Sequence, residues 1–161
     1  MKSILKQLFS LILPVTVLIV IPWSIDQHPV LASGLPLVAA LLISAVGLFV
    51  IAQTILTFIR IGRGTLAPWS PTRKLIVGGM YAYVRNPMIL GVVTVLIGES
   101  LVLLSLPILI WAILVFVINT VYFIFSEEPG LEKRFGAEYR EYKKNVPRWI
   151  PRWKPWNPVG E

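Results

Sequence analysis

Four long apolar runs, separated by polar or basic connectors, are the feature that most limits what this chain can fold into. The runs cover residues 8–25, 35–59, 88–104 and 108–125. A helix crosses a bilayer with about 20 predominantly apolar residues. Because 56% of the 161 residues are hydrophobic, a soluble domain of this length would leave much apolar surface in water. The sequence therefore predicts an all-α, polytopic membrane protein with four transmembrane helices and a single domain over residues 1–161.

The positions of the basic residues predict how the helices are oriented. All 15 Lys and Arg residues lie at the N-terminus, between 60 and 85, or between 133 and 154, and the connector 26–34 has none. Cytoplasmic segments of membrane proteins carry an excess of Lys and Arg. We therefore expect both termini, the loop 60–87 and the tail 126–161 to face the cytoplasm, in a multi-pass arrangement. This regular pattern makes nucleic acid a weaker explanation of the net charge of +7.

The N-terminal apolar run has a second interpretation. Lys2 and Lys6, an apolar stretch and then Val30-Leu31-Ala32 also fit a signal peptide. The length of the run favours a first helix that is retained.

Small residues and a short turn predict how the helices pack. Ala40 and Ser44 are four apart, and Gly91, Thr94 and Gly98 form one small-residue face, so close approach between helices is expected. The turn Ser105-Leu106-Pro107 leaves almost no loop between the third and fourth runs, which predicts a tight antiparallel hairpin. This hairpin would bring residues 85–87 and 126–129 to the same membrane face.

The tail after Pro129 has the pattern of a short amphipathic helix. Leu131, Phe135, Tyr139 and Tyr142 recur at i, i+4, i+8 and i+11, and basic residues occupy the other face. One interpretation is an interfacial helix on anionic lipid. Another is a lid whose aromatic face covers the hairpin ends. The two interpretations are compatible.

Several polar residues in or near the apolar runs are candidates for function. Glu99 is the single charged residue inside the predicted spans, about 18 Å along its helix from Pro87, a depth that argues against contact with a cytoplasmic ligand. Asn119, Tyr122 and Ser126 share one helix face and form either interhelical hydrogen bonds or a polar cavity wall.

The adjacent pair Glu127 and Glu128 has two interpretations as well. The two carboxylates could pair with basic residues at the interface. Opposite Arg85, they could instead hold a zwitterion, with a carboxylate for its ammonium and the guanidinium for its carboxylate.

Other kinds of site are not indicated. There is no cysteine, no phosphate-binding GxxxxGK[ST] motif and no dinucleotide fingerprint, and the sole histidine, His28, has no partner at ligand spacing. We therefore expect no metal.

Two blocks of sequence together resemble a known family. "GMYAYVRNPMILG" is followed about 35 residues later by "EEPGLEKRFGAEYREYKKNVPRWIP". This arrangement is similar to the isoprenylcysteine carboxyl methyltransferase and phospholipid methyltransferase superfamily, over roughly residues 73–151. The resemblance implies an integral-membrane enzyme that uses S-adenosylmethionine without a Rossmann domain. It also implies a lipophilic or lipidated acceptor that reaches the site from the membrane lipid.

The resemblance assigns roles to individual residues of this chain. Arg85 and Asn86 would be catalytic, and Asn119, Tyr122 and Phe123 would bind the acceptor. The residues implied to bind the cofactor are Arg73, Lys74, Leu75, Ile76, Tyr81, Asn86, Pro87, Met88, Ile89, Glu127 and Glu128.

Three positions depart from the family pattern. Asn86 stands where many members have His and cannot titrate near neutral pH, so it is more consistent with a positioning group than with a general base. Ile89 replaces a frequent Tyr. Phe123 stands where the prenylcysteine enzymes have an Arg for the acceptor carboxylate. Lack of an obvious base favours a carboxylate acceptor, whereas Phe123 disfavours one, and the sequence leaves the choice open.

These observations predict methyl transfer from S-adenosylmethionine to an amphiphilic acceptor at the cytoplasmic membrane face. Two alternatives are a membrane reductase that uses NADPH, related to the sterol reductases, and a non-catalytic membrane interaction protein.

Overall fold

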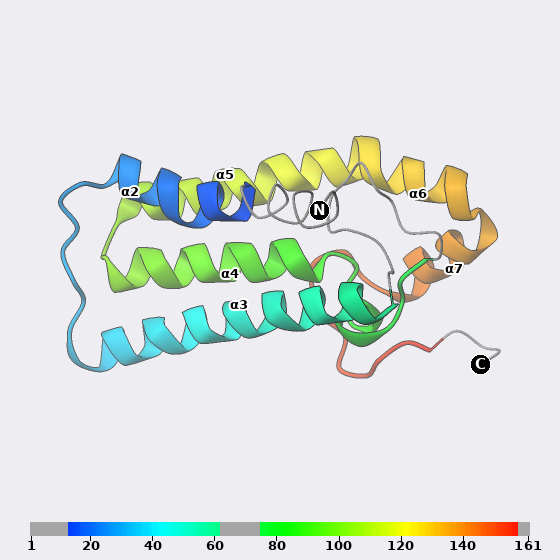
Figure 1. Ribbon diagram of the computed structural model, residues 1–161, viewed down its shortest axis with the longest axis horizontal. Helices are drawn as coiled ribbons and strands as arrows, with labels where there is room; N and C mark the ends of the chain where they lie inside the picture. The colour runs from blue at the N-terminus through cyan, green and yellow to red at the C-terminus, as the bar shows by residue number, and fades with distance from the viewer. Residues whose placement is uncertain (1–12, 62–74, 158–161) are drawn as a thin grey trace, which may run out of the picture.

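A computed structural model describes residues 13–61 and 75–157 of the chain, and its described secondary structure is entirely helical (Figure 1). A first helical segment contains the π-helical turn η1 (Thr16–Val20) and α2 (Ile21–Ile25), and the long helix α3 (Gly34–Ile61) follows. The 3-10 turn η2 (Gly79–Ala82) precedes α4 (Pro87–Val102). The remaining elements are α5 (Leu106–Tyr122), the π-helical turn η3 (Phe123–Glu127), α6 (Glu128–Phe135) and α7 (Ala137–Asn145). The predicted all-α class is confirmed.

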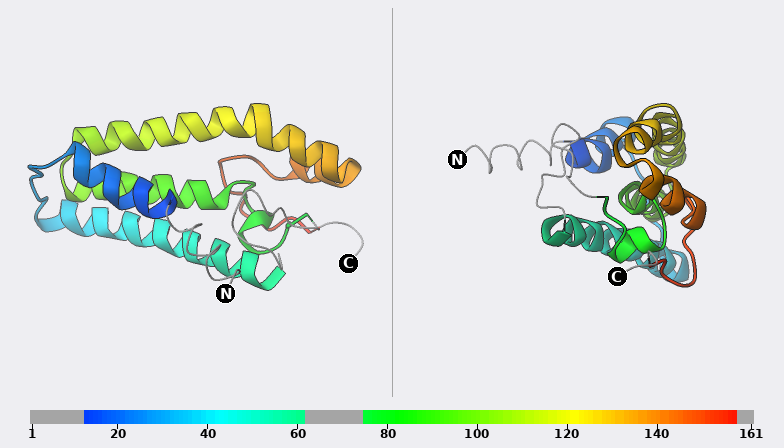
Figure 2. Two further views of the ribbon diagram at one scale, coloured as in Figure 1. Left: turned by 45° about the horizontal axis from the view of Figure 1, so that its top comes forward. Right: turned by 90° about the vertical axis from the view of Figure 1, so that its right-hand side faces the viewer.

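Helix α4 forms the centre of the molecule, between α3 and the α5–α6 helix (Figure 2). Gly91 of α4 faces Gly47 of α3, and a Cβ atom built on Gly91 would lie 3.0 Å from the Gly47 carbonyl oxygen. A Cβ atom on Gly98 would overlap the Ser44 hydroxyl. These small side chains let the two helix backbones approach closely, as the sequence predicted for Ser44, Gly91 and Gly98.

The outer helices present apolar side chains to their surroundings. Leu35, Leu42 and Phe49 of α3 are more than half exposed, and so are Ile113 and Ile118 of α5. Two described helical stretches, Gly34–Thr57 and Leu106–Phe135, have the length and composition to cross a membrane. Such outward apolar surface is suited to lipid.

The other two apolar helices are shorter than a span requires. The described parts of the first and third runs form helices at Leu13–Ile25 and Pro87–Val102. At about 1.5 Å per residue, the 16 residues of α4 rise about 24 Å, less than the ~30 Å hydrocarbon core. Neighbouring helices cover much of α4, so protein supplies part of its apolar environment. The four-span topology remains a prediction.

The predicted hairpin of the third and fourth runs is confirmed, with its turn slightly earlier than expected. Helix α4 ends at Val102, the chain reverses at residues 103–105, and Leu104 adopts a positive φ of 43°. The Ser105 hydroxyl accepts a bond of 3.4 Å from the Ile108 amide and caps α5. Leu106 and Pro107, expected in the turn, therefore belong to the first helical turn, where proline needs no amide donor.

The tail forms two short helices, where the sequence predicted one. Gly136 adopts a positive φ of 56° between α6 and α7, a conformation that glycine reaches without strain. The break turns α7 back toward the loop before α4 (Figure 1). The predicted apolar face still forms, because Tyr139 and Tyr142 are buried and Leu131 and Phe135 pack against them.

Candidate active site

The two polar clusters of the sequence meet at one end of the helical hairpin. The Arg85 Nη1 atom lies 2.8 Å from the Glu128 Oε1 atom, although the residues are 43 positions apart. Arg85 lies just before α4, and Glu128 begins α6 at the end of the continuous helix that starts with α5. The hairpin thus joins the residues that the sequence predicted at one face.

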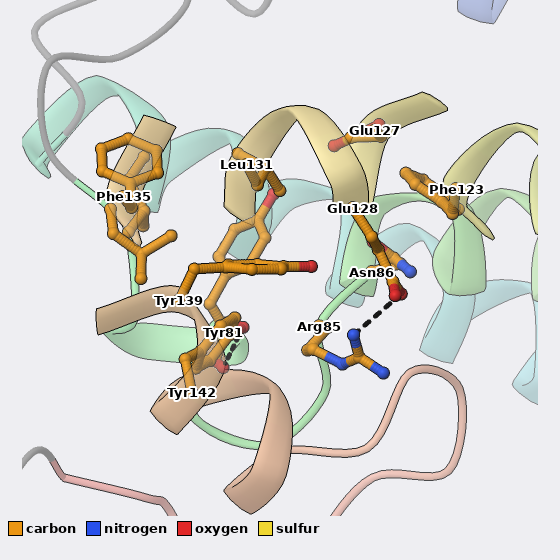
Figure 3. Close-up of a pocket in the computed structure, with 12 residues that line it drawn as sticks. Tyr81, Arg85, Asn86, Phe123, Glu127, Glu128, Leu131, Phe135, Tyr139 and Tyr142 are labelled. Atoms are coloured by element: carbon orange, nitrogen blue, oxygen red, sulfur yellow. Dashed lines mark hydrogen bonds and ion pairs between the residues drawn. The ribbon is translucent and has the colours of Figure 1, made fainter. Parts of the chain in front are cut away.

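A cavity of about 100 Å³ opens between these clusters and α7 (Figure 3). Its wall combines charged groups near α4 with aromatic groups from the tail. The lining residues are Leu75, Ile76, Tyr81, Arg85, Asn86, Phe123, Glu127, Glu128, Leu131, Phe135, Tyr139 and Tyr142.

Glu128 is the buried anionic centre of this end of the molecule. It is 4% exposed and accepts two bonds from Arg148, 2.6 Å from Nε to Oε1 and 3.1 Å from Nη2 to Oε2. Arg85 shares Oε1, and the Lys143 Nζ lies 3.4 Å from Oε2. Burial raises the pKa of Glu128, but the hydrogen bonds and charges of Arg148 and Arg85 outweigh it and lower the pKa below its usual value. Glu128 is therefore a carboxylate at neutral pH.

Glu127 has the opposite electrostatic environment. It lies beyond the predicted span 108–125, is partly buried, and forms no ion pair within residues 13–61 and 75–157. Burial, and then repulsion from Glu128, raise the pKa of Glu127 to about 7. A cation placed in the cavity would favour its charged form.

Three tyrosines line the cavity, Tyr81 from η2 and Tyr139 and Tyr142 from α7. The Tyr142 hydroxyl donates a 2.8 Å hydrogen bond to the Tyr81 carbonyl oxygen. Burial raises the pKa values of Tyr81 and Tyr142, and raises that of Tyr139 to about 12. All three side chains are consequently neutral near pH 7.

Two contacts fix the loop before α4 in place. Gly79 has a φ of 62°, and a Cβ there would lie 2.6 Å from the Thr57 hydroxyl oxygen of α3. The loop also forms three backbone hydrogen bonds of 2.9–3.0 Å with the tail. The Arg85 amide donates to the Pro147 carbonyl, the Arg152 amide donates to the Tyr83 carbonyl, and the Trp156 amide donates to the Ala82 carbonyl. These bonds position Arg85 and Asn86 at the cavity.

Asn86 and Phe123 form the wall nearest α4 and α5. Asn86 directly precedes α4 and does not cap it through its side chain, and its buried Nδ2 atom has no hydrogen-bond partner in the part of the chain described. The ring of Phe123 lies 5.7 Å from that of Trp149, which also contacts Phe116 at 4.9 Å. Asn86 and Phe123 thus line the cavity together, and the amide nitrogen of Asn86 is buried without a hydrogen-bond partner among the described residues.

The structure brings together many, but not all, of the residues predicted for the site. Leu75, Ile76, Tyr81, Arg85, Asn86, Phe123, Glu127 and Glu128 line the cavity. Pro87, Met88, Ile89, Asn119 and Tyr122 do not.

The predicted residues away from the cavity have other surroundings. Pro87 is buried and Ile89 packs against the helical core. Asn119 donates to the Val115 carbonyl within α5, and Tyr122 is 47% exposed. Glu99 also lies outside the cavity. Arg73 and Lys74 fall outside the described residues.

Sequence reasoning missed Arg148, which binds Glu128. Its neighbour Trp149 packs on Phe123. The motif "VPRW" contained both residues, but their contacts depend on how the tail turns back. Tyr139 and Tyr142 had been assigned to the covering face without a site role. Within residues 13–61 and 75–157, no group of three His, Asp or Glu residues could hold a metal ion.

The structure thus combines an apolar helical hairpin with a charged and aromatic cavity at one end, which is a candidate ligand site. The model of the phospholipid methyltransferase family matches residues 35–138. This match covers more than half of the chain, which therefore belongs to that family and is a membrane methyltransferase. Comparison with curated proteins gave no match, and comparison with solved structures gave none.

Proposed function

We propose that this protein transfers a methyl group from S-adenosylmethionine to a lipophilic or amphiphilic acceptor at the cytoplasmic membrane face. The activity would be like that of the isoprenylcysteine carboxyl methyltransferases. The observation that carries the proposal is the Glu127 carboxyl group in an aromatic-walled cavity, where its raised pKa marks a place that a cation would stabilise.

The donor set of the cavity fits this cofactor. Glu127 would accept hydrogen bonds from its ammonium group, and the unpartnered Asn86 Nδ2 atom would donate to its carboxylate. Tyr81, Tyr139 and Phe123 supply aromatic surface for adenine and for the sulfonium cation. The cavity is smaller than the ~300–1,000 Å³ typical of ligand sites, so these residues would contact only part of the cofactor. Arg73 and Lys74 remain proposed contacts for the rest.

The structure changes the roles proposed for Arg85 and Glu128. Their side chains bind each other, and both are more than 90% buried. We assign them the role of shaping the site and leave Glu127 as the carboxylate for the cofactor. Pro87, Met88 and Ile89 would then support the start of α4 rather than touch the ligand.

In the proposed reaction, the protein would contribute mainly by aligning the reacting groups and less by transferring protons. S-adenosylmethionine supplies an electrophilic methyl group when it is bound. Asn86 cannot take up a proton near neutral pH, so its role would be to orient a reacting group by hydrogen bonding. The tail residues Tyr139 and Tyr142 cover one side of the cavity, which would keep water from the reacting atoms.

The acceptor would reach the cavity from the lipid side of α5. Phe123 lines the cavity, while Phe125, two residues further along η3, is 77% exposed on the outside of the helix. An apolar chain could therefore follow the outer surface of α5 toward the site. Tyr122 is a proposed contact along this outer surface. Asn119, bonded to its own helix, is a less direct candidate. Multi-pass insertion with both termini in the cytoplasm would place the cavity at the cytoplasmic interface.

Calorimetry of the purified protein in detergent tests the cofactor assignment. We expect binding of S-adenosylhomocysteine and none of NADPH, which distinguishes a methyltransferase from a reductase. Glu127→Gln should weaken S-adenosylhomocysteine binding at least tenfold, because a charge-assisted hydrogen bond contributes about 1.5–3 kcal/mol. Glu138→Gln, at an exposed position of α7, is the matched control. Equal affinities of the two variants would refute the role of Glu127.

A second experiment addresses the acceptor. Labelled S-adenosylmethionine is added to membranes that contain the protein, and the labelled lipid or protein species are then identified. Transfer to a lipophilic product that is absent in the Glu127→Gln membranes would support the proposal. A protein that binds the cofactor but labels nothing would favour the non-catalytic alternative.

A further inference from the structure

The two neighbouring carboxylates of the site, Glu127 and Glu128, have different electrostatic surroundings. Glu128 is 4% exposed and lies within 3.4 Å of cationic groups from Arg85, Lys143 and Arg148. Glu127 forms no ion pair in the described part of the chain, and the charge of Glu128 acts on it repulsively. Burial is the larger cause of the raised pKa of Glu127, and the charge of Glu128 adds to it, so neutralisation of Glu128 makes it easier for Glu127 to carry a charge.

Arg148 is the cation best placed to neutralise Glu128. Its Nε and Nη2 atoms bind the two carboxylate oxygens at 2.6 and 3.1 Å, a bidentate arrangement. Arg85 contributes one bond of 2.8 Å, and the Lys143 ammonium is more distant and 41% exposed. Removal of Arg148 would take away the most complete of the three interactions.

Arg148 reaches Glu128 because the tail is bound to the loop before α4. The preceding residue, Pro147, accepts a hydrogen bond from the Arg85 amide, and Val146 is buried. After Arg148, the Arg152 amide donates to the Tyr83 carbonyl. The guanidinium is thus held at the site by bonds on both sides of it in the sequence.

We propose that Arg148 is a positioning residue of the cofactor site: by neutralising Glu128 it allows Glu127 to be ionised and to bind the cofactor's cation. This inference rests on the proposed function. The tail would then affect cofactor binding through the charge of Arg148, although Arg148 itself does not line the cavity.

Of the titratable groups that face Glu127, Glu128 is the one whose charge Arg148 can neutralise. Tyr81 of η2 and Tyr139 of α7 interact electrostatically with Glu127, and Glu128 is its neighbour on α6. Both tyrosines remain neutral between pH 5 and 8 because burial raises their pKa values. Loss of Arg148 would consequently act on Glu127 through the charge of Glu128.

The test is the affinity for S-adenosylhomocysteine, measured by calorimetry from pH 5.5 to 8.5 on the full chain in detergent. Arg148→Gln should move the midpoint of the affinity–pH curve upward by about 0.5–1 unit, because Glu128 then repels the Glu127 carboxylate more strongly. Arg148→Lys, which retains the charge, should restore part of this shift. Arg140→Gln, an exposed arginine on α7, is the matched control and should leave the midpoint unchanged.

Three outcomes separate this inference from the proposed function. A midpoint that does not move in Arg148→Gln overturns the inference, even if the affinity falls uniformly through a structural defect. If that variant does not fold, Glu128→Gln should shift the midpoint downward, and an unchanged midpoint there is equally decisive. Failure of the unmodified protein to bind S-adenosylhomocysteine at any pH would instead overturn the proposed function, and this inference with it.

Discussion

The Tyr142 hydroxyl of α7 donates a 2.8 Å hydrogen bond to the Tyr81 carbonyl of η2, and so joins the tail to the loop that begins α4. Both residues line the cavity. The bond crosses 61 positions of sequence, and Tyr142 is 3% exposed. It supports the interpretation of the tail as a cover over the hairpin ends.

We expect Tyr142→Phe to weaken this connection without emptying the space that the ring fills. The Tyr81 carbonyl would lose this hydrogen bond, at a cost of about 0.5–1.5 kcal/mol. The melting temperature in detergent should fall, and the affinity for S-adenosylhomocysteine should fall several-fold. Tyr83→Phe, in the same loop, provides a control. Identical melting temperatures for Tyr142→Phe and the unmodified protein would show that the bond adds nothing.

A methyl group at Gly98 should separate α3 from α4. The new Cβ would meet the Ser44 side chain and lie 2.8 Å from the Ser44 amide nitrogen, which belongs to the backbone and cannot rotate away. Overpacking of this kind costs about 1–3 kcal/mol. Gly98→Ala should therefore lower the melting temperature in detergent.

Gly130→Ala is the matched control for that substitution. A Cβ at Gly130 of α6 has nothing within 4 Å, and alanine is about 1 kcal/mol better than glycine inside a helix. The two glycine variants should thus shift the melting temperature in opposite directions. A shift of the same sign in both would contradict the close packing of α3 on α4.

The ionisation of Glu127 predicts opposite pH effects on stability and on binding. Its pKa rises from an unfolded value of about 4.5 to about 7 in the folded protein. Its contribution to stability is therefore fully present below pH ~4.5 and is lost as the pH rises through 7. The melting temperature of the ligand-free protein should drop over this window by more than in Glu127→Gln.

Binding should show the reverse trend, because the cofactor's ammonium group requires the carboxylate. We expect the affinity for S-adenosylhomocysteine to rise by up to tenfold per unit below pH 7 and to level off above it. Calorimetry at several pH values measures this directly. A flat profile between pH 5.5 and 8.5 would argue that Glu127 does not bind the ammonium group.

Asn86 should act as a hydrogen-bond donor rather than as a base. Asn86→Ala removes the buried Nδ2 atom, and loss of one hydrogen bond of about 1 kcal/mol would weaken S-adenosylhomocysteine binding about fivefold. Asn86→His, which can donate from a similar position, should bind within about twofold of the unmodified protein. Asn145→Ala, at an exposed site at the end of α7, controls for loss of an amide. Equal affinities for Asn86→Ala and Asn145→Ala would exclude this role.

The sequence by itself determined the helical class, the hairpin and the meeting of Arg85 with the acidic pair. These conclusions rested on local features: apolar runs, a turn too short for a loop, and small residues at helical spacing. Once two consecutive helices are antiparallel, their ends must lie together, whatever the side-chain details. The sequence also predicted the apolar face that contains Tyr139 and Tyr142, because its helical period continues across Gly136.

Only the tertiary structure decided which acidic residue is ion-paired within the part of the chain that the structure describes. Glu127 and Glu128 are indistinguishable in a sequence pattern, but a helix turns by about 100° per residue and points them in different directions. Glu128 meets Arg85 and Arg148, whereas Glu127 lines the cavity. Arg148 was likewise invisible from sequence, because the reversal at Gly136 and the backbone bonds of the tail bring it back over 20 positions to Glu128.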